Sequence, residues 1–221
     1  MQNKYIGRVS IMKNKKLNTL VKISLLGAMA FILMFFEFRL PLFPDFLKID
    51  ISDVPALLGA FALGPVEGVI IELLKNILHG TIKGSSTMWV GELANFLIGS
   101  AYVYAAGFVY KRNKSRKTAM QGMLIGIIAT VIVASVFNYY VLIPFYAVLY
   151  HMDIKAIVAM ASKANSNITS LWTYILWAVV PFNTLKGIVI AAITAPAYKK
   201  VSPIFHKEAV IERKAKKLNQ I

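Results

Sequence analysis

The sequence predicts an all-α integral membrane protein that folds as a bundle of six transmembrane helices. Hydrophobic residues make up 57% of its 221 residues, and the mean hydropathy is +0.62. The stretch from Thr118 to Tyr150 contains no Asp, Glu, Lys or Arg. It is longer than the roughly 20 apolar residues that cross a hydrocarbon core of about 30 Å. Basic residues gather beside the apolar segments, as they do in the cytoplasmic loops of membrane proteins.

The distribution of positive charge predicts the orientation of the bundle. The net charge is +15, and 18 of the 25 Lys and Arg residues lie in three blocks, at 4–22, 111–117 and 199–217. Because such blocks stay on the cytoplasmic side, both termini are expected there, and no nucleic-acid partner is expected. We therefore predict one membrane domain over 1–221, with a basic cytoplasmic segment at 1–22, the six-helix bundle at 23–198 and a basic cytoplasmic tail at 199–221.

Parity of the crossings decides how the region after the first helix is built. If the first two basic blocks lie on the same side, an even number of crossings separates them. Residues 54–80 then form two short helices that turn at Gly64-Pro65, with Asp53 as cap and Pro55 in the first turn of the first of them. The expected helices are Ile23–Phe36, 54–63, Val66–Leu78, Met88–Tyr110, Thr118–Tyr150 and about Ser170–Tyr198.

Two features of the later part of the chain lead to further predictions. Pro144 lacks a backbone N–H, so it should loosen or end the fifth helix. Residues 151–169 show no strong motif and are expected to form an outer loop.

Polar side chains within the predicted membrane helices are candidates for a ligand site. Lys186 lies about 20 Å from either end of its helix, too deep for its side chain to reach the interface. It either pairs with Glu72 or Glu92 or lines a polar site, together with Asn183 one turn away. Asn138, beside aromatic residues such as Phe137, either bonds a neighbouring helix or forms part of a binding wall.

Two further groups of polar residues lie near the outer side. Glu72, Lys75, Asn76 and His79 are spaced by three and four residues and so share one helix face. We expect them to pair with one another, to line an aqueous cavity or to lie at the outer interface. Glu92 and Asn95 form a similar pair, one turn apart on the next helix.

The loop from Leu40 to Asp53 is too apolar to be an idle solvated connection. Pro41 and Pro44 prevent a helix there, while Phe43 and Phe46 are large and hydrophobic. The loop is either an anchor among the lipid headgroups or a lid folded over a pocket.

Several chemistries are absent from the sequence. There are no cysteines, and the three histidines show no metal-binding spacing, so no metal site or metal cofactor is expected. The phosphate-binding loop G-x-x-x-x-G-K-[ST] does not occur, so the chain is not expected to hydrolyse ATP. An intramembrane enzyme that uses Glu72 or Glu92 with His79 is a weaker hypothesis, because no nucleophile motif accompanies these residues. The chain is therefore not expected to be an enzyme.

Four short motifs resemble those of the substrate-binding (S) components of energy-coupling factor (ECF) vitamin transporters, and most closely the riboflavin-specific branch. The resemblance spans residues 20–200. Its specific part comprises 47–55 (LKIDISDVP), 64–68 (GPVEG), 72–76 (ELLKN) and 91–96 (GELANF).

The resemblance implies a riboflavin-binding subunit of a bacterial cell membrane, which works with a transmembrane coupling (T) protein and two cytoplasmic ATPases. An S component for another vitamin or small aromatic solute is the alternative. In the family, two alanines four residues apart in the first helix contact the T protein; here Ser24 stands in place of the first alanine and Ala28 at the second. Riboflavin is a transported ligand, and no cofactor is implied. The candidate ligand contacts are Leu47, Ile49, Asp50, Glu92, Asn95, Asn138, Asn183 and Lys186, with Phe137 able to stack on the flavin rings.

Overall fold

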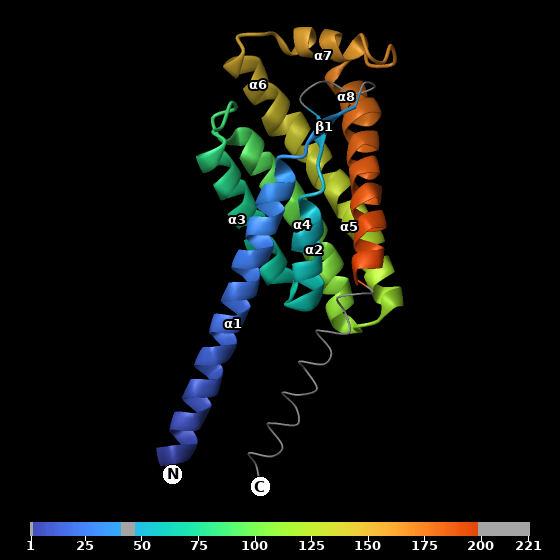
Figure 1. Cartoon of the computed structure of the whole chain (residues 1–221). Coiled ribbons are helices and arrows are strands. Elements are labelled where there is room, and N and C mark those ends of the chain that lie inside the picture. The colour runs from blue at the N-terminus through green and yellow to red at the C-terminus, as the bar shows by residue number, and fades with distance from the viewer. Residues whose placement is uncertain (1, 41–46, 199–221) are drawn as a thin grey trace.

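The computed structural model describes residues 2–40 and 47–198, with side chains from Lys16 onward except that of Arg39. These residues form an elongated helical bundle (Figure 1). The N-terminus and the connection between α4 (Val90–Arg112) and α5 (Arg116–Phe137) lie toward one end. Helix α7 (Ile154–Ser162) lies across the other end, which we call the α7 end. Pro41, Pro44, Phe43, Phe46 and the tail at 199–221 lie outside the described residues.

The first helix is much longer than predicted. Helix α1 runs from Gln2 to Met34 and projects well beyond the bundle (Figure 1). The predicted start at Ile23 is therefore wrong, because the Lys and Arg residues before it are good helix formers and no proline interrupts them. Within the bundle, Ile23, Ala30 and Met34 are buried while Leu25 and Ile32 are exposed, so one face packs on the protein and the other is apolar and uncovered.

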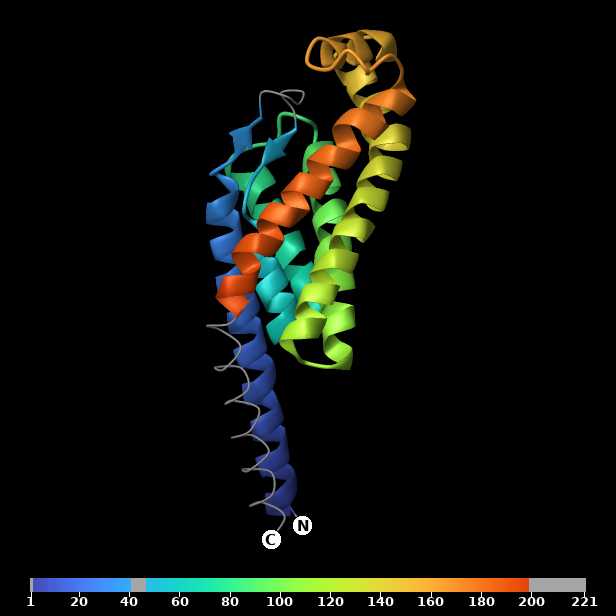
Figure 2. The same ribbon diagram turned by 90° about the vertical axis from the view of Figure 1, so that its right-hand side faces the viewer.

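Two short strands follow α1, where the sequence indicated only a loop. Strand β1 (Phe38–Arg39) pairs antiparallel with β2 (Lys48–Ile49), with Phe38 opposite Ile49. The strand pair lies at the α7 end in both views (Figures 1 and 2). It brings the segment after β2 back onto the bundle, where α2 begins.

The predicted turn at Gly64-Pro65 is confirmed. Helix α2 covers Asp53–Ala62 and α3 covers Pro65–Ile82, four residues longer than predicted at its C-terminal end. Gly64 has φ 144° and ψ 164°, a conformation that only glycine adopts without strain. The chain can therefore reverse within one residue, and α2 and α3 pack as an antiparallel hairpin.

Pro144 does not end the fifth helix. Helix α5 (Arg116–Phe137) continues through a π-helical segment, η1 (Asn138–Leu142), into α6 (Ile143–Leu149). The π turn lies immediately before the proline, and the i→i+5 bonding there is the local adjustment through which the helix continues. Helix α4 (Val90–Arg112) precedes α5 and starts two residues later than predicted, because Met88 and Trp89 have positive φ.

The last described part of the chain, from Ile154 to Tyr198, is helical except at residues 163–170. Helix α7 (Ile154–Ser162) lies within the predicted outer loop, where a strong turn signal was absent. Helix α8 (Leu171–Tyr174), the π segment η2 (Ile175–Val179) and residues 180–198 then form one continuous helix. This final helix crosses the bundle at an incline (Figure 2).

Buried side chains form two apolar clusters. The first includes Leu57, Phe61, Tyr102 and Ile190. It contains residues of helices α1, α2, α3, α4 and α5 and of the C-terminal part of the final helix. The second gathers under α7 and the strand pair, and includes Tyr146, Tyr174, Val179, Phe182 and Leu47. The polar residues described below lie between the helices that these clusters hold together.

Within residues 2–40 and 47–198, four helical stretches are long and apolar enough to cross a membrane. Their outer faces carry large apolar side chains such as Leu25 and Leu124, 63% and 61% exposed, which suit contact with acyl chains. Helix α2, with ten residues, is shorter, and α3 contains Glu67, Glu72 and Lys75. The four stretches are Lys16–Met34, Val90–Arg112, Arg116–Leu149 and Leu171–Tyr198.

Close packing of α4 on α5 provides a test of the bundle. A Cβ atom at Gly122 would lie 2.6 Å from the backbone carbonyl oxygen of Ala106. We expect Gly122→Ala to push the two helices apart and destabilise the protein by about 1–3 kcal/mol, because backbone cannot move aside as a side chain can. Thermal unfolding in detergent measures this, with the lipid-facing Val136→Ile as control. An unchanged midpoint for Gly122→Ala would contradict the packing.

Candidate ligand-binding site

A cavity of about 220 Å³ lies between the strand pair, α3, α4, η1, α6 and the final helix. Its wall combines amide, carboxylate and ammonium groups with apolar and aromatic side chains, the usual composition of a small-molecule site. Seven of the eight candidate ligand contacts line it; their role in binding stays a prediction. These seven are Leu47, Asp50, Glu92, Asn95, Asn138, Asn183 and Lys186.

Ile49 is the candidate that does not line the cavity. Its backbone pairs with Phe38, and its side chain is 8% exposed within the second apolar cluster. The alternation of a strand explains this, since Lys48 lines the cavity and its neighbour points the other way. Leu47 and Ile49 are both buried, so the described part of the loop folds onto the protein and is not an anchor at the lipid headgroups.

The aromatic residues beside Asn138 do not face the cavity. Phe137 packs at the edge of the second apolar cluster, and Tyr140 is 72% exposed. Phe137 is not among the residues that line the cavity, so the structure gives no support to its stacking on a ligand, which stays a prediction. Tyr146 and Phe182 are the aromatic residues of the cavity wall. Tyr146 is eight residues from Asn138, a spacing of two helical turns that places both on one face.

Two amides share one arrangement at the cavity wall. The Asn138 side-chain N–H donates to the carbonyl oxygen of Ala134, and that of Asn183 donates to the carbonyl oxygen of Val179, each at 2.8 Å. The Asn138 side chain is buried, and its Oδ1 has no hydrogen-bond partner within the described part of the chain. A buried acceptor without a donor is unfavourable, so a ligand that offers an N–H or O–H would satisfy it.

Both amides are connected to π-helical segments. Asn138 is the first residue of η1, and the acceptor for Asn183 is the last residue of η2. The two segments contact each other. A π turn adds a residue to the helical repeat and redirects the side chains that follow, which is why such turns occur often at functional sites. No sequence pattern predicted either segment.

Lys186 forms ion pairs with different partners from those predicted. Its ammonium lies 3.2 Å from Asp50 Oδ2 and 3.3 Å from Asp53 Oδ2. Pairing with Glu72 or Glu92 is therefore wrong, while the cavity-lining position is confirmed. The actual partners lie just before α2 and at its first residue. The strand pair positions this segment inside the bundle, and no local sequence pattern predicts that position.

Asp53 does not cap α2. It is the first helical residue, and its carboxylate bonds the ammonium of Lys75, which also donates to Ser52 Oγ at 2.9 Å. Asp50 forms the local turn: its Oδ1 accepts from the Ser52 N–H at 2.8 Å while Oδ2 faces Lys186. The turn and the cavity-facing contact at Asp50 are thus both present.

The polar face of α3 divides into two parts. Glu72 Oε2 lies 2.8 Å from the ammonium of Lys75, which confirms their pairing, and both side chains are fully buried. Further along, His79 lines the cavity, and its Nδ1 is 3.7 Å from Glu92 Oε1. Glu92 also accepts from Ser85 Oγ at 2.7 Å. These contacts hold the helix faces together across α3 and α4.

Glu37 forms a small ion-pair cluster at the α7 end of the cavity. Its Oε1 lies 2.6 Å from the ammonium of Lys48 and 3.1 Å from that of Lys83. Partial burial would raise the pKa of Glu37, but the hydrogen bonds and charges of the two lysines outweigh it and hold that pKa below its ordinary value. The cluster ties the end of α1 to β2 and to the end of α3.

The lowered pKa of Glu37 predicts a pH-dependent contribution to stability. This contribution is present above the ordinary carboxyl pKa and is lost as the pH falls through the lowered one. We expect Glu37→Gln to lower the unfolding midpoint at pH 7, and we expect this deficit to shrink as the pH falls below the ordinary carboxyl pKa. The control is Glu67→Gln, which removes a carboxylate at the opposite end of α3. A Glu37→Gln deficit as large at low pH as at pH 7 would rule out the ion-pair origin.

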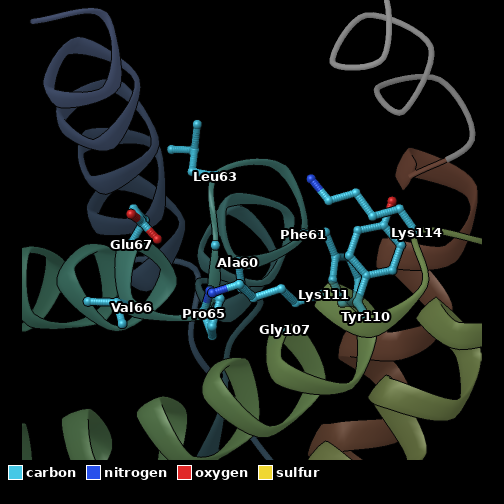
Figure 3. A pocket seen from close by; sticks show the side chains of 11 residues that line it. Ala60, Phe61, Leu63, Pro65, Val66, Glu67, Gly107, Tyr110, Lys111 and Lys114 are labelled. Carbon is cyan, nitrogen blue, oxygen red and sulfur yellow. The ribbon is translucent and has the colours of Figure 1, made fainter. Parts of the chain in front are cut away.

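A second cavity, of about 210 Å³, lies at the opposite end of the bundle, beside the α2–α3 turn (Figure 3). Tyr110 and Phe61 form one side, with ring centroids 4.8 Å apart. Lys111 and Glu67 carry opposite charges on its wall. None of the candidate ligand contacts lies there. Among the described residues, no cluster of His, Asp or Glu suited to a metal ion is present at either cavity.

Comparison with known proteins assigns the family. Residues 18–198 match the family model for the substrate-specific component of ECF transporters. The chain belongs to this family. A solved S component of a bacterial ECF transporter has a TM-score of 0.67 and 34% sequence identity, and the match covers 86% of this chain and 98% of that one.

Two sequence relatives of this S component carry functional names. The riboflavin transporter RibU of Staphylococcus aureus is 36% identical, covering 88% of this chain and 94% of its own. The riboflavin transporter FmnP of Bacillus subtilis is 35% identical, covering 85% and 94%. The family consists of transporter components, so the intramembrane-enzyme hypothesis has no support from it. This S component is a multi-pass protein of the bacterial cell membrane.

The two residues expected at a partner interface lie on one exposed face of α1. Ser24 and Ala28 are both exposed, while Ile23 and Gly27 beside them face the bundle. A Cβ at Gly27 would lie 2.5 Å from a side-chain carbon of Leu74 on α3, which shows how closely that inner face packs. The Ser24–Ala28 face is therefore available to another helix, and its role as an interface stays a prediction.

Proposed function

We propose that this S component binds riboflavin from the outside of the cell and delivers it to an ATP-driven ECF complex. The observation that carries the proposal is the cavity at the α7 end, where an unpaired amide oxygen of Asn138 and the ammonium of Lys186 share one wall. The names of its riboflavin-transporting relatives support the choice of ligand.

The chemistry of the cavity suits the polar edge of a flavin. That edge presents an N–H between two carbonyl groups, so it needs one acceptor and flanking donors. Asn138 Oδ1 supplies the acceptor, and Lys186 supplies a donor to a carbonyl oxygen. Tyr146 and Phe182 provide aromatic surface for the ring system. Glu92 and Asn95, at the opposite wall, can accept from and donate to the ribityl hydroxyls.

In this proposal the bundle crosses the membrane six times with both termini in the cytoplasm. The N-terminus, the Gly64 turn and the basic α4–α5 connection lie toward one end of the molecule, which fits the cytoplasmic location of basic loops (Figure 1). Helix α2, about 15 Å long, is too short to span the bilayer alone. The strand pair lies beyond its N-terminal end, toward the α7 end, and would take up the outer part of that layer.

The energy for transport comes from partner proteins in this proposal. The chain contains no phosphate-binding loop, so two cytoplasmic ATPases and a T protein would supply ATP hydrolysis and coupling. The exposed small side chains of Ser24 and Ala28 would let a helix of the T protein approach α1 closely.

The proposal is tested first by the colour of the purified protein. We expect protein purified in detergent to retain flavin absorption in the visible range, or to acquire it when riboflavin is added and excess is washed away. Protein that stays colourless under both conditions contradicts riboflavin binding. Binding of a different vitamin in the same assay would identify an S component of another specificity.

Replacement of the polar residues tests the site. We expect Asn138→Ala and Lys186→Ala each to weaken riboflavin binding by about 10-fold or more, because each leaves a ligand polar group unpaired in a buried site. Quenching of riboflavin fluorescence measures the Kd. Lys155→Ala, on the exposed surface of α7, is the control. If both variants bind as tightly as the parent protein, the site is misplaced.

A bulky residue on α1 tests the partner interface. We expect Ala28→Trp to reduce co-purification of the T protein and the ATPases severalfold, because small side chains are needed where helices approach closely. Riboflavin binding should be unchanged, since Ala28 is exposed and does not line the cavity. Val136→Trp, on a lipid-facing position of α5, is the matched control. Full assembly of the Ala28→Trp complex would place the interface elsewhere.

A further inference from the structure

We propose that Asp53 and Lys75 are positioning residues that hold Lys186 at the cavity wall, and that Glu72 takes part in their network as a neutral acid. Asp53, Lys75 and Glu72 do not line the cavity. The inference rests on the proposed function for its ligand, and extends it to residues that never touch the ligand.

The geometry places Lys186 between the cavity and a fully buried ion-pair network. Its ammonium is shared between Asp50 and Asp53, at 3.2 and 3.3 Å. Asp53 in turn accepts from Lys75 on α3, which is 0% exposed. The position of Asp53 is therefore set on one side by Lys75 and on the other by Lys186. Displacement of Asp53 would move the ammonium that faces the ligand.

Without Lys75, the balance of charge around Lys186 changes. Asp53 would lose its second cation and would draw the Lys186 ammonium toward itself, away from the cavity. An ammonium held by two carboxylates keeps its remaining N–H directed at the ligand only while both carboxylates stay in place. Lys75 therefore affects the ligand through Lys186, although it makes no contact with the cavity.

The number of charges in the network indicates that one of its carboxyl groups carries a proton. Three carboxylates, of Asp50, Asp53 and Glu72, surround the two ammonium groups of Lys75 and Lys186, and all five side chains are buried. A fully ionised cluster would carry one uncompensated negative charge in a region of low dielectric, which is strongly unfavourable. Protonation of one carboxyl group makes the cluster neutral.

Glu72 is the carboxyl group that the surroundings stabilise least as an anion. Each aspartate faces Lys186 and a second hydrogen-bond donor, whereas Glu72 faces Lys75 alone. On the α4 side its Oε2 lies against Gly99, which has no side chain to donate a hydrogen bond. Within the described residues, Glu72 Oε1 has no hydrogen-bond partner, and Oε2 has only the ammonium of Lys75. Replacing Glu72 with its neutral isostere should therefore change little.

A double-mutant cycle tests whether Lys75 acts through Lys186. We expect Lys75→Met to raise the riboflavin Kd by about 10-fold in the parent protein and by less than about 3-fold in the Lys186→Ala background. Asp53→Asn is the second variant, with the same expectation, in case Lys75→Met does not fold. An equal fold-change in both backgrounds would mean a general packing effect and would overturn the positioning role, as would no change in either.

The charge state of Glu72 is tested by Glu72→Gln. We expect its riboflavin Kd and its unfolding midpoint to match those of Glu67→Gln, the same chemical change elsewhere on α3. A 10-fold loss of affinity specific to Glu72→Gln would show that its negative charge is needed and would overturn its assignment as a neutral acid.

Failure of the proposed function is distinguishable from failure of this inference. If the parent protein binds no riboflavin, the proposed ligand is wrong. The same double-mutant cycle is then evaluated from thermal unfolding midpoints measured without ligand. Coupling between Lys75→Met and Lys186→Ala in those midpoints, together with a neutral Glu72→Gln, would support the network. Additive midpoints would refute it.

Discussion

The buried ion pairs around Asp53 are the interaction on which the site depends. Asp53 joins α2 to Lys75 on α3 and to Lys186 on the final helix, while Asp50 joins the same lysine to the strand pair. Removing one partner of a buried pair typically destabilises a protein by about 3–5 kcal/mol, because the other charge is left uncompensated. The network therefore fixes the relative positions of segments that are far apart in the chain.

The two π-helical segments meet a different requirement. A helix through a membrane must satisfy its own backbone groups, so it cannot simply unwind to turn a side chain toward a ligand. A π turn redirects side chains while the chain stays helical. At η1 it also lets α5 continue past Pro144. The amides of Asn138 and Asn183 are thus held on rigid helices at the cavity wall.

Much of the fold followed from patterns that are local in the sequence. Apolar runs identified the long helices, and Gly64-Pro65 identified the hairpin of α2 and α3. The polar residues within apolar runs also identified most of the cavity wall, since a charge or amide at that depth must face protein or water. Errors arose where neighbours far along the chain decide the outcome, as with the strand pair and the inward direction of Ile49.

The sequence by itself determined that the protein is a helical membrane protein, and which of its polar residues are too deep to face lipid, because both depend only on hydropathy and on distance along a helix. The tertiary structure alone decided which charges meet. Lys186 lies next to Asp50 and Asp53, and not next to Glu72 or Glu92, because the strand pair carries the start of α2 into the bundle. That path depends on strand pairing across the eight residues between β1 and β2, which helical periodicity does not predict.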